Sequence, residues 1–253
     1  MSENAYIKGV KNRILAALPQ QEYERLLPKM EKVVLEYNQP LFEPDQCIKH
    51  VYFPYSGVVS LLNVMENGDT AEVGMVGYEG IVGLPVFLDA DSVSSLAIVQ
   101  IEGEAMKMKT EDFRAEANRQ GPLHRLLQRY TQALLMQISQ SAACNRFHSM
   151  EERFCRWILM SHDRVRSDKF PMTHEFISKM LGVRRPSISV IAAMLQKAEL
   201  ISYNRGKMTI LDRKGLEAGS CECYGILKKD FDRLIGGNIE AKAKQDRTGQ
   251  GGL

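Results

Sequence analysis

The residues between 182 and 189 carry side chains suited to contacts with nucleic acid. They include two arginines and two serines, namely Arg184, Arg185, Ser187 and Ser189. An arginine can donate two hydrogen bonds to O6 and N7 of guanine, and a serine hydroxyl can reach a base or a phosphate. Pro186 fits the first turn of a helix, where its missing N–H costs nothing. The pattern predicts a helix that begins at Arg185 and presents these side chains to the major groove of DNA.

The flanking sequence predicts the elements that would position this helix. Thr173 is a suitable N-cap for a short preceding helix, and we count it among the residues near DNA. Gly182 permits a sharp turn between the two helices. Two short strands follow between about residues 200 and 211, and they flank a basic turn. The residues of that turn that would contact phosphates are Arg205 and Lys207. Together these elements predict a winged helix-turn-helix.

The distribution of charge favours a polyanionic partner for the same region. Residues 146–214 contain 14 Lys and Arg against 7 Asp and Glu. Residues 1–145 contain 13 Lys and Arg against 18 Asp and Glu, and the last 39 residues contain six of each sign. A basic segment between acidic and neutral neighbours is typical of a part that binds nucleic acid. A solvated surface of mixed charge explains the counts equally well.

The five cysteines do not follow the pattern of a disulfide framework, so we expect reduced thiols and a cytoplasmic protein. Cys221 and Cys223 form the only close pair, and two thiolates could begin a metal site. No Cys or His with finger-like spacing follows them, so we predict no metal and no cofactor. Cys144 and Cys155 lie in predicted helices and are expected to be packed. The alternative for the 221–223 segment is a C-terminal helix packed on the winged domain through Tyr224, Leu227 and Phe231.

The first 120 residues predict a domain of many short strands. Between residues 32 and 108, short runs of Val, Ile, Tyr and Phe alternate with Gly, Pro, Asn and Asp. This texture is typical of a sandwich or barrel. Asn67-Gly68 is a strong signal for a tight hairpin.

A long helix is predicted from Gly121 to about Phe147. Its apolar residues recur at heptad spacing, and two such helices from two subunits would meet along them. The residues assigned to this dimerisation seam are Leu123, Leu127, Tyr130 and Leu134. A second stripe would face the strands of the same chain, through Leu126, Ala133, Ile138 and Ala142. The alternative is a long helix packed entirely inside one chain.

The order of a β domain, a long helix and a winged helix-turn-helix resembles the cyclic-AMP receptor protein/Fnr (Crp/Fnr) superfamily of bacterial transcription regulators. The resemblance covers roughly residues 10–235. The family's recognition turn reads Gly-x-Ser-Arg-Glu-Thr-Val, and residues 182–188 here read Gly-Val-Arg-Arg-Pro-Ser-Ile. The resemblance places Arg185 on the family's first base-contacting arginine. Pro186 stands in place of the family's glutamate, and Val190 in place of a second arginine, so the resemblance implies the DNA-binding mode but not the operator.

The family's cyclic-nucleotide site is only partly matched. Its glutamate, which pairs with the ribose, is replaced by Ile81, and its phosphate-binding arginine is missing because no arginine lies between Glu79 and Gln100. The resemblance therefore implies an effector other than a cyclic nucleotide. The residues that would line an effector pocket are Gly80, Gly83, Leu84, Ser94 and Ser95. The two serines fit ordinary turn residues as well. No cysteine precedes Cys47, so the iron–sulfur cluster of Fnr-type members is not expected.

The predicted fold class is α+β, with an N-terminal jelly-roll domain similar to cyclic-nucleotide-binding domains (1–120), a dimerisation helix (121–147), a winged helix-turn-helix (148–235) and a disordered tail (236–253). The predicted function is sequence-specific transcription regulation by a homodimer on a near-palindromic operator in double-stranded DNA. RNA polymerase and an unknown small molecule are the further partners, and no membrane contact is expected. No nucleophile elbow, P-loop, dinucleotide fingerprint or zinc motif is present, so we predict that the protein is not an enzyme. The alternative is a constitutive regulator whose β domain senses nothing.

Overall fold

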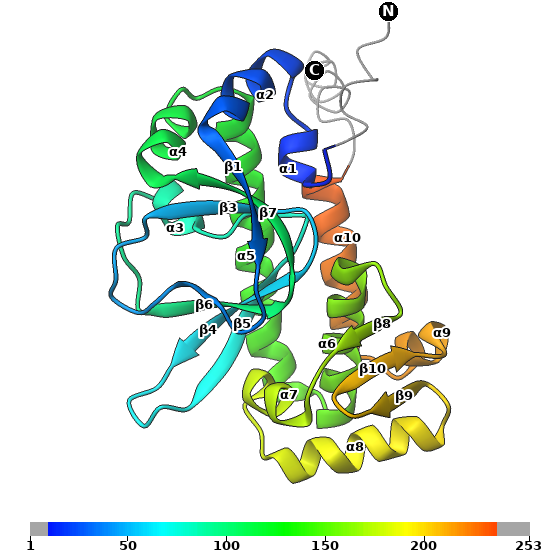
Figure 1. The fold of residues 1–253 in the computed structure, drawn as a ribbon. Coiled ribbons are helices and arrows are strands. Elements are labelled where there is room, and N and C mark those ends of the chain that lie inside the picture. Colours follow the sequence, from blue (N-terminus) through cyan, green and yellow to red (C-terminus); the bar gives the residue numbers. More distant parts are fainter. Residues whose placement is uncertain (1–9, 237–253) are drawn as a thin grey trace, which may run out of the picture.

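The computed structural model describes residues 10–236 as an N-terminal β domain, a long central helix and a C-terminal winged domain (Figure 1). The β domain has a sheet of order β1-β7-β3 and a sheet of order β2-β6-β4-β5, and all strand pairs are antiparallel. The strands are β1 (Met30–Leu35), β2 (Pro40–Phe42), β3 (His50–Pro54), β4 (Val58–Val64), β5 (Thr70–Val76), β6 (Ser95–Ile101) and β7 (Gly103–Lys109). The predicted α+β class with an N-terminal jelly roll is confirmed.

The β domain also contains short helices. They are α1 (Arg13–Ala16), α2 (Gln20–Leu26), the 3₁₀ turn η2 (Leu27–Lys29), α3 (Leu84–Phe87) and α4 (Thr110–Ala117). The predicted hairpin joins β4 to β5, with Gly68 in the left-handed region at φ +85° and the Met65 N–H donating to Asp69 O at 2.8 Å. Asn-Gly is favoured there because such a turn needs a residue that accepts a positive φ.

The long helix α5 (Pro122–Phe147) is present as predicted, but its apolar seam does not face a second subunit. Leu123, Leu127, Tyr130 and Leu134 are only 0–7% exposed, and all four belong to the core of the β domain. Leu134, for example, packs on Gly74 of β5. The prediction that these four residues meet a second subunit was therefore wrong. Heptad spacing suits a helix that packs on its own sheet as well as one that packs on a second copy of itself.

Gln137, one turn beyond Leu134 on the same face of α5, also makes its contacts within the chain. Gln137 accepts a hydrogen bond from the Met75 N–H at 2.6 Å and donates one to Met75 O at 3.2 Å. β5 is an edge strand of its sheet, so Gln137 binds backbone groups that have no neighbouring strand on that side. The opposite face of α5 stays exposed, and its side chains include Gln128, Gln132, Leu135, Ser139 and Ala142.

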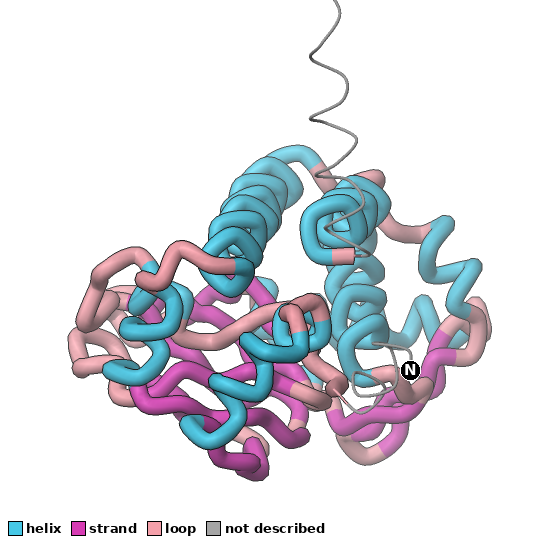
Figure 2. Tube along the Cα trace, turned by 90° about the horizontal axis from the view of Figure 1, so that it is seen from above, coloured by secondary structure: helices cyan, strands magenta, loops and turns pink. Residues whose placement is uncertain are grey.

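The winged domain follows α5 directly. Its elements are α6 (Met150–Val165), β8 (Lys169–Pro171), α7 (His174–Leu181), α8 (Arg185–Lys197), β9 (Ile201–Asn204), β10 (Lys207–Ile210), α9 (Arg213–Ala218) and α10 (Cys223–Ile235). Its three strands form a sheet of order β8-β10-β9. In Figure 2 the strands fall into two separate groups, one for each domain, with helices between and beside them.

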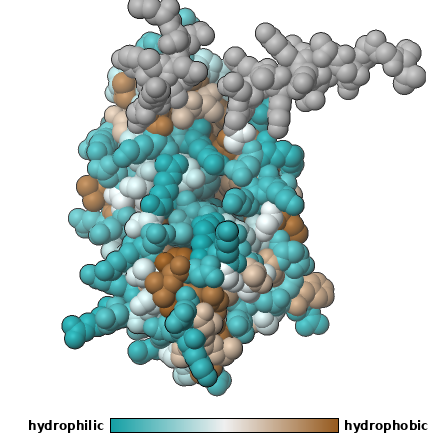
Figure 3. All heavy atoms as spheres, turned by 90° about the vertical axis from the view of Figure 1, so that its right-hand side faces the viewer, coloured by the Kyte–Doolittle hydropathy of each residue, from teal (hydrophilic) through white to brown (hydrophobic). Residues whose placement is uncertain are grey.

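The C-terminal helix α10 is buried through Tyr224, Leu227 and Phe231, as expected for a packed helix. It lies along α5 as well as α6, and Phe231 joins the core of the β domain. The side of the molecule that lies to the right in Figure 1 has a mostly hydrophilic surface, with small hydrophobic areas (Figure 3). Within residues 10–236, no helix is both long and apolar enough to cross a membrane. The predicted disordered tail, apart from Gly236, lies outside the described residues.

Candidate nucleic-acid interface

The turn between α7 and α8 is fixed by local hydrogen bonds. Thr173 caps α7, with its Oγ1 accepting from the Phe176 N–H at 3.1 Å, so this hydroxyl is already engaged in the fold. Gly182 ends α7 in the left-handed region at φ +64°, and the Val183 N–H donates to Ser178 O at 2.9 Å. This arrangement satisfies the last carbonyls of α7 and turns the chain sharply into α8.

The N-terminal end of α8 presents its basic side chains to solvent. Arg184 is the N-cap, and Arg185 and Pro186 form the first turn, as predicted. Arg184, Arg185 and Ser187 are all exposed, whereas the next residue, Ile188, is fully buried. The buried residues of α8 therefore hold the helix on the domain and leave its N-terminal end projecting outward.

Ser189 is oriented by the protein itself. Its hydroxyl lies 3.0 Å from His174 Nδ1 and donates to Arg185 O at 3.3 Å. The His174 ring stacks on Tyr203 of β9, with centroids 4.2 Å apart. Burial, and next the charge of Arg185, lower the pKa of His174, which favours the neutral ring. Ser189 and His174 together therefore link α7, α8 and the wing.

His174 and Tyr203 were not singled out from the sequence. The sequence did place Tyr203 on a predicted strand and His174 directly after the predicted N-cap Thr173, and this was the only sign that the two could be paired. Such a pair can stack only once β9 is folded against the start of α7.

The wing is a tight turn between β9 and β10. Arg205 and Gly206 have φ of +48° and +75°, as a two-residue turn between paired strands requires. Arg205 and Lys207 are both exposed. The backbone of Gly206 accepts a hydrogen bond from the Met172 N–H at 2.7 Å, which ties the turn to the segment before α7.

The basic side chains of the helix end and the wing carry uncompensated charge. Among the described residues, none of the four, Arg184, Arg185, Arg205 and Lys207, forms an ion pair, whereas Lys179 on α7 is paired with Glu175 at 3.4 Å. Unpaired exposed cations produce a positive potential that attracts phosphates.

The five residues predicted to line an effector pocket lie in different surroundings. A Cβ at Gly80 would collide with the ring of Tyr130, whose hydroxyl donates to Ile81 O at 3.4 Å. Gly83 begins α3 at φ +102°, and Leu84 is buried in the core. Ser94 is exposed, and Ser95 begins β6. Within the described chain, no hydrogen bond joins either serine to the 80–84 segment, so the predicted residues do not form one polar site.

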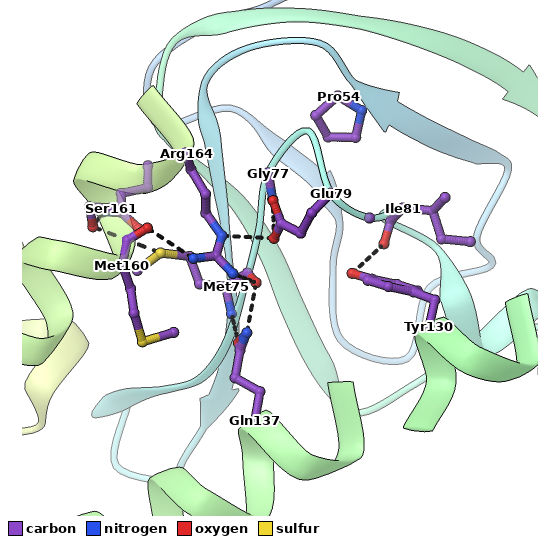
Figure 4. A network of polar contacts seen from close by, with 12 residues as sticks. Pro54, Met75, Gly77, Glu79, Ile81, Tyr130, Gln137, Met160, Ser161 and Arg164 are labelled. Atoms are coloured by element: carbon purple, nitrogen blue, oxygen red, sulfur yellow. Dashed lines mark hydrogen bonds and ion pairs between the residues drawn. The ribbon is translucent and has the colours of Figure 1, made fainter. Parts of the chain in front are cut away.

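A buried ion pair next to this segment connects the β domain to α6 (Figure 4). Arg164 Nε donates to Glu79 Oε1 at 2.8 Å, and the two side chains are 9% and 7% exposed. The same guanidinium donates to Met160 O at 2.9 Å and to Met75 O at 3.4 Å. Arg164 is buried and charged, and it donates to acceptors in both the β domain and α6. It is therefore the central polar link between the β domain and the winged domain.

A second buried carboxyl lies at the same interface. Trp157 Nε1 of α6 donates to Glu72 Oε1 of β5 at 2.8 Å, and the other carboxyl oxygen is buried without a partner among the described residues. Burial raises the pKa of Glu72 to about 7, although the hydrogen bond from Trp157 and the nearby Arg156 and Arg164 act in the opposite direction.

Cys221 and Cys223 have neighbours that the sequence did not suggest. The fold brings Cys144 and His148, from the end of α5, next to the two thiols. The signal in the sequence was the i, i+4 spacing of Cys144 and His148 on a helix, which places both side chains on one face.

The family model of the Crp-like helix-turn-helix domain matches residues 152–218, from α6 to the end of α9. The chain contains a Crp-like helix-turn-helix domain. The predicted resemblance to the Crp/Fnr superfamily is thus confirmed for the part of the chain that would meet DNA. The comparison with curated proteins found no match.

Solved structures extend the likeness beyond the Crp-like domain. FixK2 from Bradyrhizobium japonicum is 15% identical, with a TM-score of 0.64 over 76% of this chain and 98% of FixK2. TTHB099, a CRP-family transcriptional regulator from Thermus thermophilus, is 17% identical, with a TM-score of 0.62 over 74% of this chain and 96% of that protein. The c-di-GMP-responsive regulator CLP from Xanthomonas campestris is 15% identical, with a TM-score of 0.59 over 76% of this chain and 99% of CLP. At these identities the likeness shows a shared fold.

Proposed function

We propose that the protein is a DNA-binding transcription regulator of the Crp/Fnr type. The observation that carries this proposal is the exposed, unpaired Arg184-Arg185 pair at the start of α8, held by the Gly182 turn within the Crp-like domain. Arg185 would read a base edge in the major groove. Arg205 and Lys207 would contact phosphates beside it. Ser187 is free for either role, and Ser189 and Thr173 would act by shaping the surface.

The active form would be a homodimer. Because the predicted seam is buried, the surface available on α5 is its opposite face, with Leu135 at 61% exposure as its largest apolar side chain. The exposed residues Gln128, Gln132, Leu135, Ser139 and Ala142 recur at spacings of four and three, which suits two helices that cross at a small angle. A symmetric dimer carries two copies of α8 and would read a near-palindromic operator.

The effector, if the β domain responds to one, would not be a cyclic nucleotide bound in the family's usual way. Tyr130 fills the space at Gly80, Ile81 stands in place of the family's ribose-binding glutamate, and the nearby Glu79 is paired with Arg164. A cavity beside this ion pair, lined by Arg13, Tyr78 and Phe231, lies between the β domain, α6 and α10. A ligand that binds there would act on the link between the domains. A constitutive regulator with a β domain used only for assembly is the second candidate, and the filled Gly80 region favours it.

The regulator would act in the cytoplasm and contact RNA polymerase at its promoters, and we propose no catalytic function for it. Selection of bound sequences from random double-stranded DNA tests the proposal. The wild-type protein should enrich one near-palindromic motif, and the control Lys197→Ala, at the far end of α8, should enrich the same motif. Cyclic AMP, cyclic GMP and c-di-GMP added at micromolar concentration should leave the affinity unchanged. Failure to enrich any motif would refute DNA-binding regulation, and a shift with a cyclic nucleotide would refute the proposed effector class.

A further inference from the structure

Four side chains from two distant segments gather at the junction of α5 and α10. We call them the Cys3His cluster, and its members are Cys144, His148, Cys221 and Cys223. One potential ligand atom from each lies within 4.8 Å of all the others. The three cysteines are at most 4% exposed and contact one another apart from the two main hydrophobic cores. Buried thiols grouped with a histidine, away from the aliphatic cores, require an explanation other than simple packing.

The distances inside the Cys3His cluster match those between the ligands of a small tetrahedral metal ion. Cys144 Sγ and Cys221 Sγ are 3.5 Å apart, and Cys223 Sγ is 3.5 Å from His148 Nδ1. With Zn–S bonds of about 2.3 Å and Zn–N bonds of about 2.0 Å, tetrahedral geometry places ligand atoms about 3.5–3.8 Å apart. The two closest contacts thus have the spacing of neighbouring zinc ligands, and all four ligand atoms lie within 4.8 Å of one another.

The surroundings of His148 are those of a ligating imidazole. Its Nδ1 faces Cys223, and its Nε2 lies 3.1 Å from Glu222 Oε2. A metal-bound histidine usually donates its other N–H to a carboxylate, which fixes the tautomer and the orientation of the ring. Gln140 Nε2 lies 3.0 Å from Cys223 Sγ, a hydrogen bond that would stabilise a thiolate there.

The charges around the Cys3His cluster also favour an occupied site. Arg153 and Arg156 lie on α6, and Arg156 Nη1 donates to Ser141 Oγ, one turn before Cys144 on α5, at 3.4 Å. The Nε of each guanidinium is buried without a hydrogen-bond partner among residues 10–236. Three thiolates, a neutral imidazole and Zn²⁺ together carry one negative charge. That charge would compensate part of the positive charge that α6 buries beside the cluster.

We propose that the Cys3His cluster binds one Zn²⁺ in a closed, structural site. Soft sulfur ligands with one imidazole in tetrahedral array select zinc, and four protein ligands leave no open position for catalysis. The ion would join the C-terminal end of α5, and the junction that leads into α6, to the first turn of α10. It would thereby fix the winged domain on the long helix. On binding, each thiol loses its proton to solvent, and no electron is transferred.

Metal content of the purified, reduced full-length protein is the first test. We expect about one Zn²⁺ per chain, removable by a chelator. Replacement by Co²⁺ should give the visible bands of tetrahedral cobalt and a sulfur-to-cobalt charge-transfer band. This spectrum is measured on the wild-type protein, so it stands even if a variant fails to fold.

Variants then identify the ligands. Cys144→Ser and Cys223→Ser should lose the metal, whereas Cys155→Ser, a buried cysteine of α6 outside the Cys3His cluster, should keep it. Glu222→Gln retains all four ligands and should weaken Zn²⁺ affinity roughly 10- to 100-fold. Chelation should raise hydrogen exchange at the end of α5 and the start of α10.

Several results would overturn the proposal. One is wild-type protein that contains no metal and gives no cobalt spectrum. Another is the brown absorbance of an iron–sulfur cluster, and a third is a Cys144–Cys221 disulfide in place of bound metal. Retention of zinc by Cys144→Ser or Cys223→Ser would contradict the ligand assignment. None of these measurements depends on DNA binding, so the proposed function and the zinc site can fail separately.

Discussion

The start of α8 and the segment around Glu79 both contain charged side chains, but the two regions use them differently. Arg184 and Arg185 are exposed, and within residues 10–236 neither side chain has an acceptor or an ion-pair partner. Arg164 and Glu79 are buried and paired with each other, and Arg164 also donates to the backbone. A side chain that the fold leaves without a partner is available to a ligand, whereas one that the fold pairs holds domains together.

The largest predicted effect follows from breaking the buried pair. Arg164→Ala leaves Glu79 buried without its cation and removes three hydrogen bonds, so it should lower the free energy of unfolding by about 3–5 kcal/mol. Arg13→Ala, which breaks the exposed pair with Asp232, should cost less than about 1 kcal/mol. Chemical denaturation of both variants measures the difference. Equal losses would mean that the Arg164–Glu79 pair is not the link that we describe.

The two faces of α5 give a second contrast. Leu127→Ala creates a cavity in the core and should lower the free energy of unfolding by about 2–5 kcal/mol. Leu135→Asp replaces an exposed side chain, so the fold should remain, but the charge would disrupt a dimer formed through this face. Sedimentation and denaturation of both variants separate the two effects. A dimeric Leu135→Asp protein would show that the subunits meet elsewhere.

Glu72 makes the interface between the domains sensitive to pH. Its pKa is about 7 in the folded protein, compared with an ordinary value of 4.5, so the folded state holds a proton that the unfolded chain releases. The contribution of this proton to stability is complete below about pH 4.5 and is lost as the pH rises through about 7. Glu72→Gln should therefore flatten the fall in unfolding free energy between about pH 5 and pH 8. An unchanged pH profile in that variant would assign the dependence to another group.

The sequence predicted elements whose ends are set by local residues. Thr173, Gly182 and Pro186 define a cap, a turn and a helix start within a few residues of each other, so the helix-turn-helix was predicted closely. The face of α5 was not predictable in the same way, because Leu127 suits a sheet and a second helix equally. The Cys3His cluster was missed because its halves lie 77 residues apart, between Cys144 and Cys221, and only the packing of α10 along α5 brings them together.

The central claim is that Arg185 reads a base while the wing only contacts phosphates. The most direct measurement is the binding of wild-type, Arg185→Ala and Lys207→Ala proteins to a library of operator variants at two salt concentrations. Arg185→Ala should cost roughly 1–3 kcal/mol per half-site and relax the preference at one base-pair position. Lys207→Ala should weaken all sequences about equally and reduce the salt slope by about one unit. An unchanged base preference in Arg185→Ala, together with an altered one in Lys207→Ala, would contradict the placement of α8 in the groove.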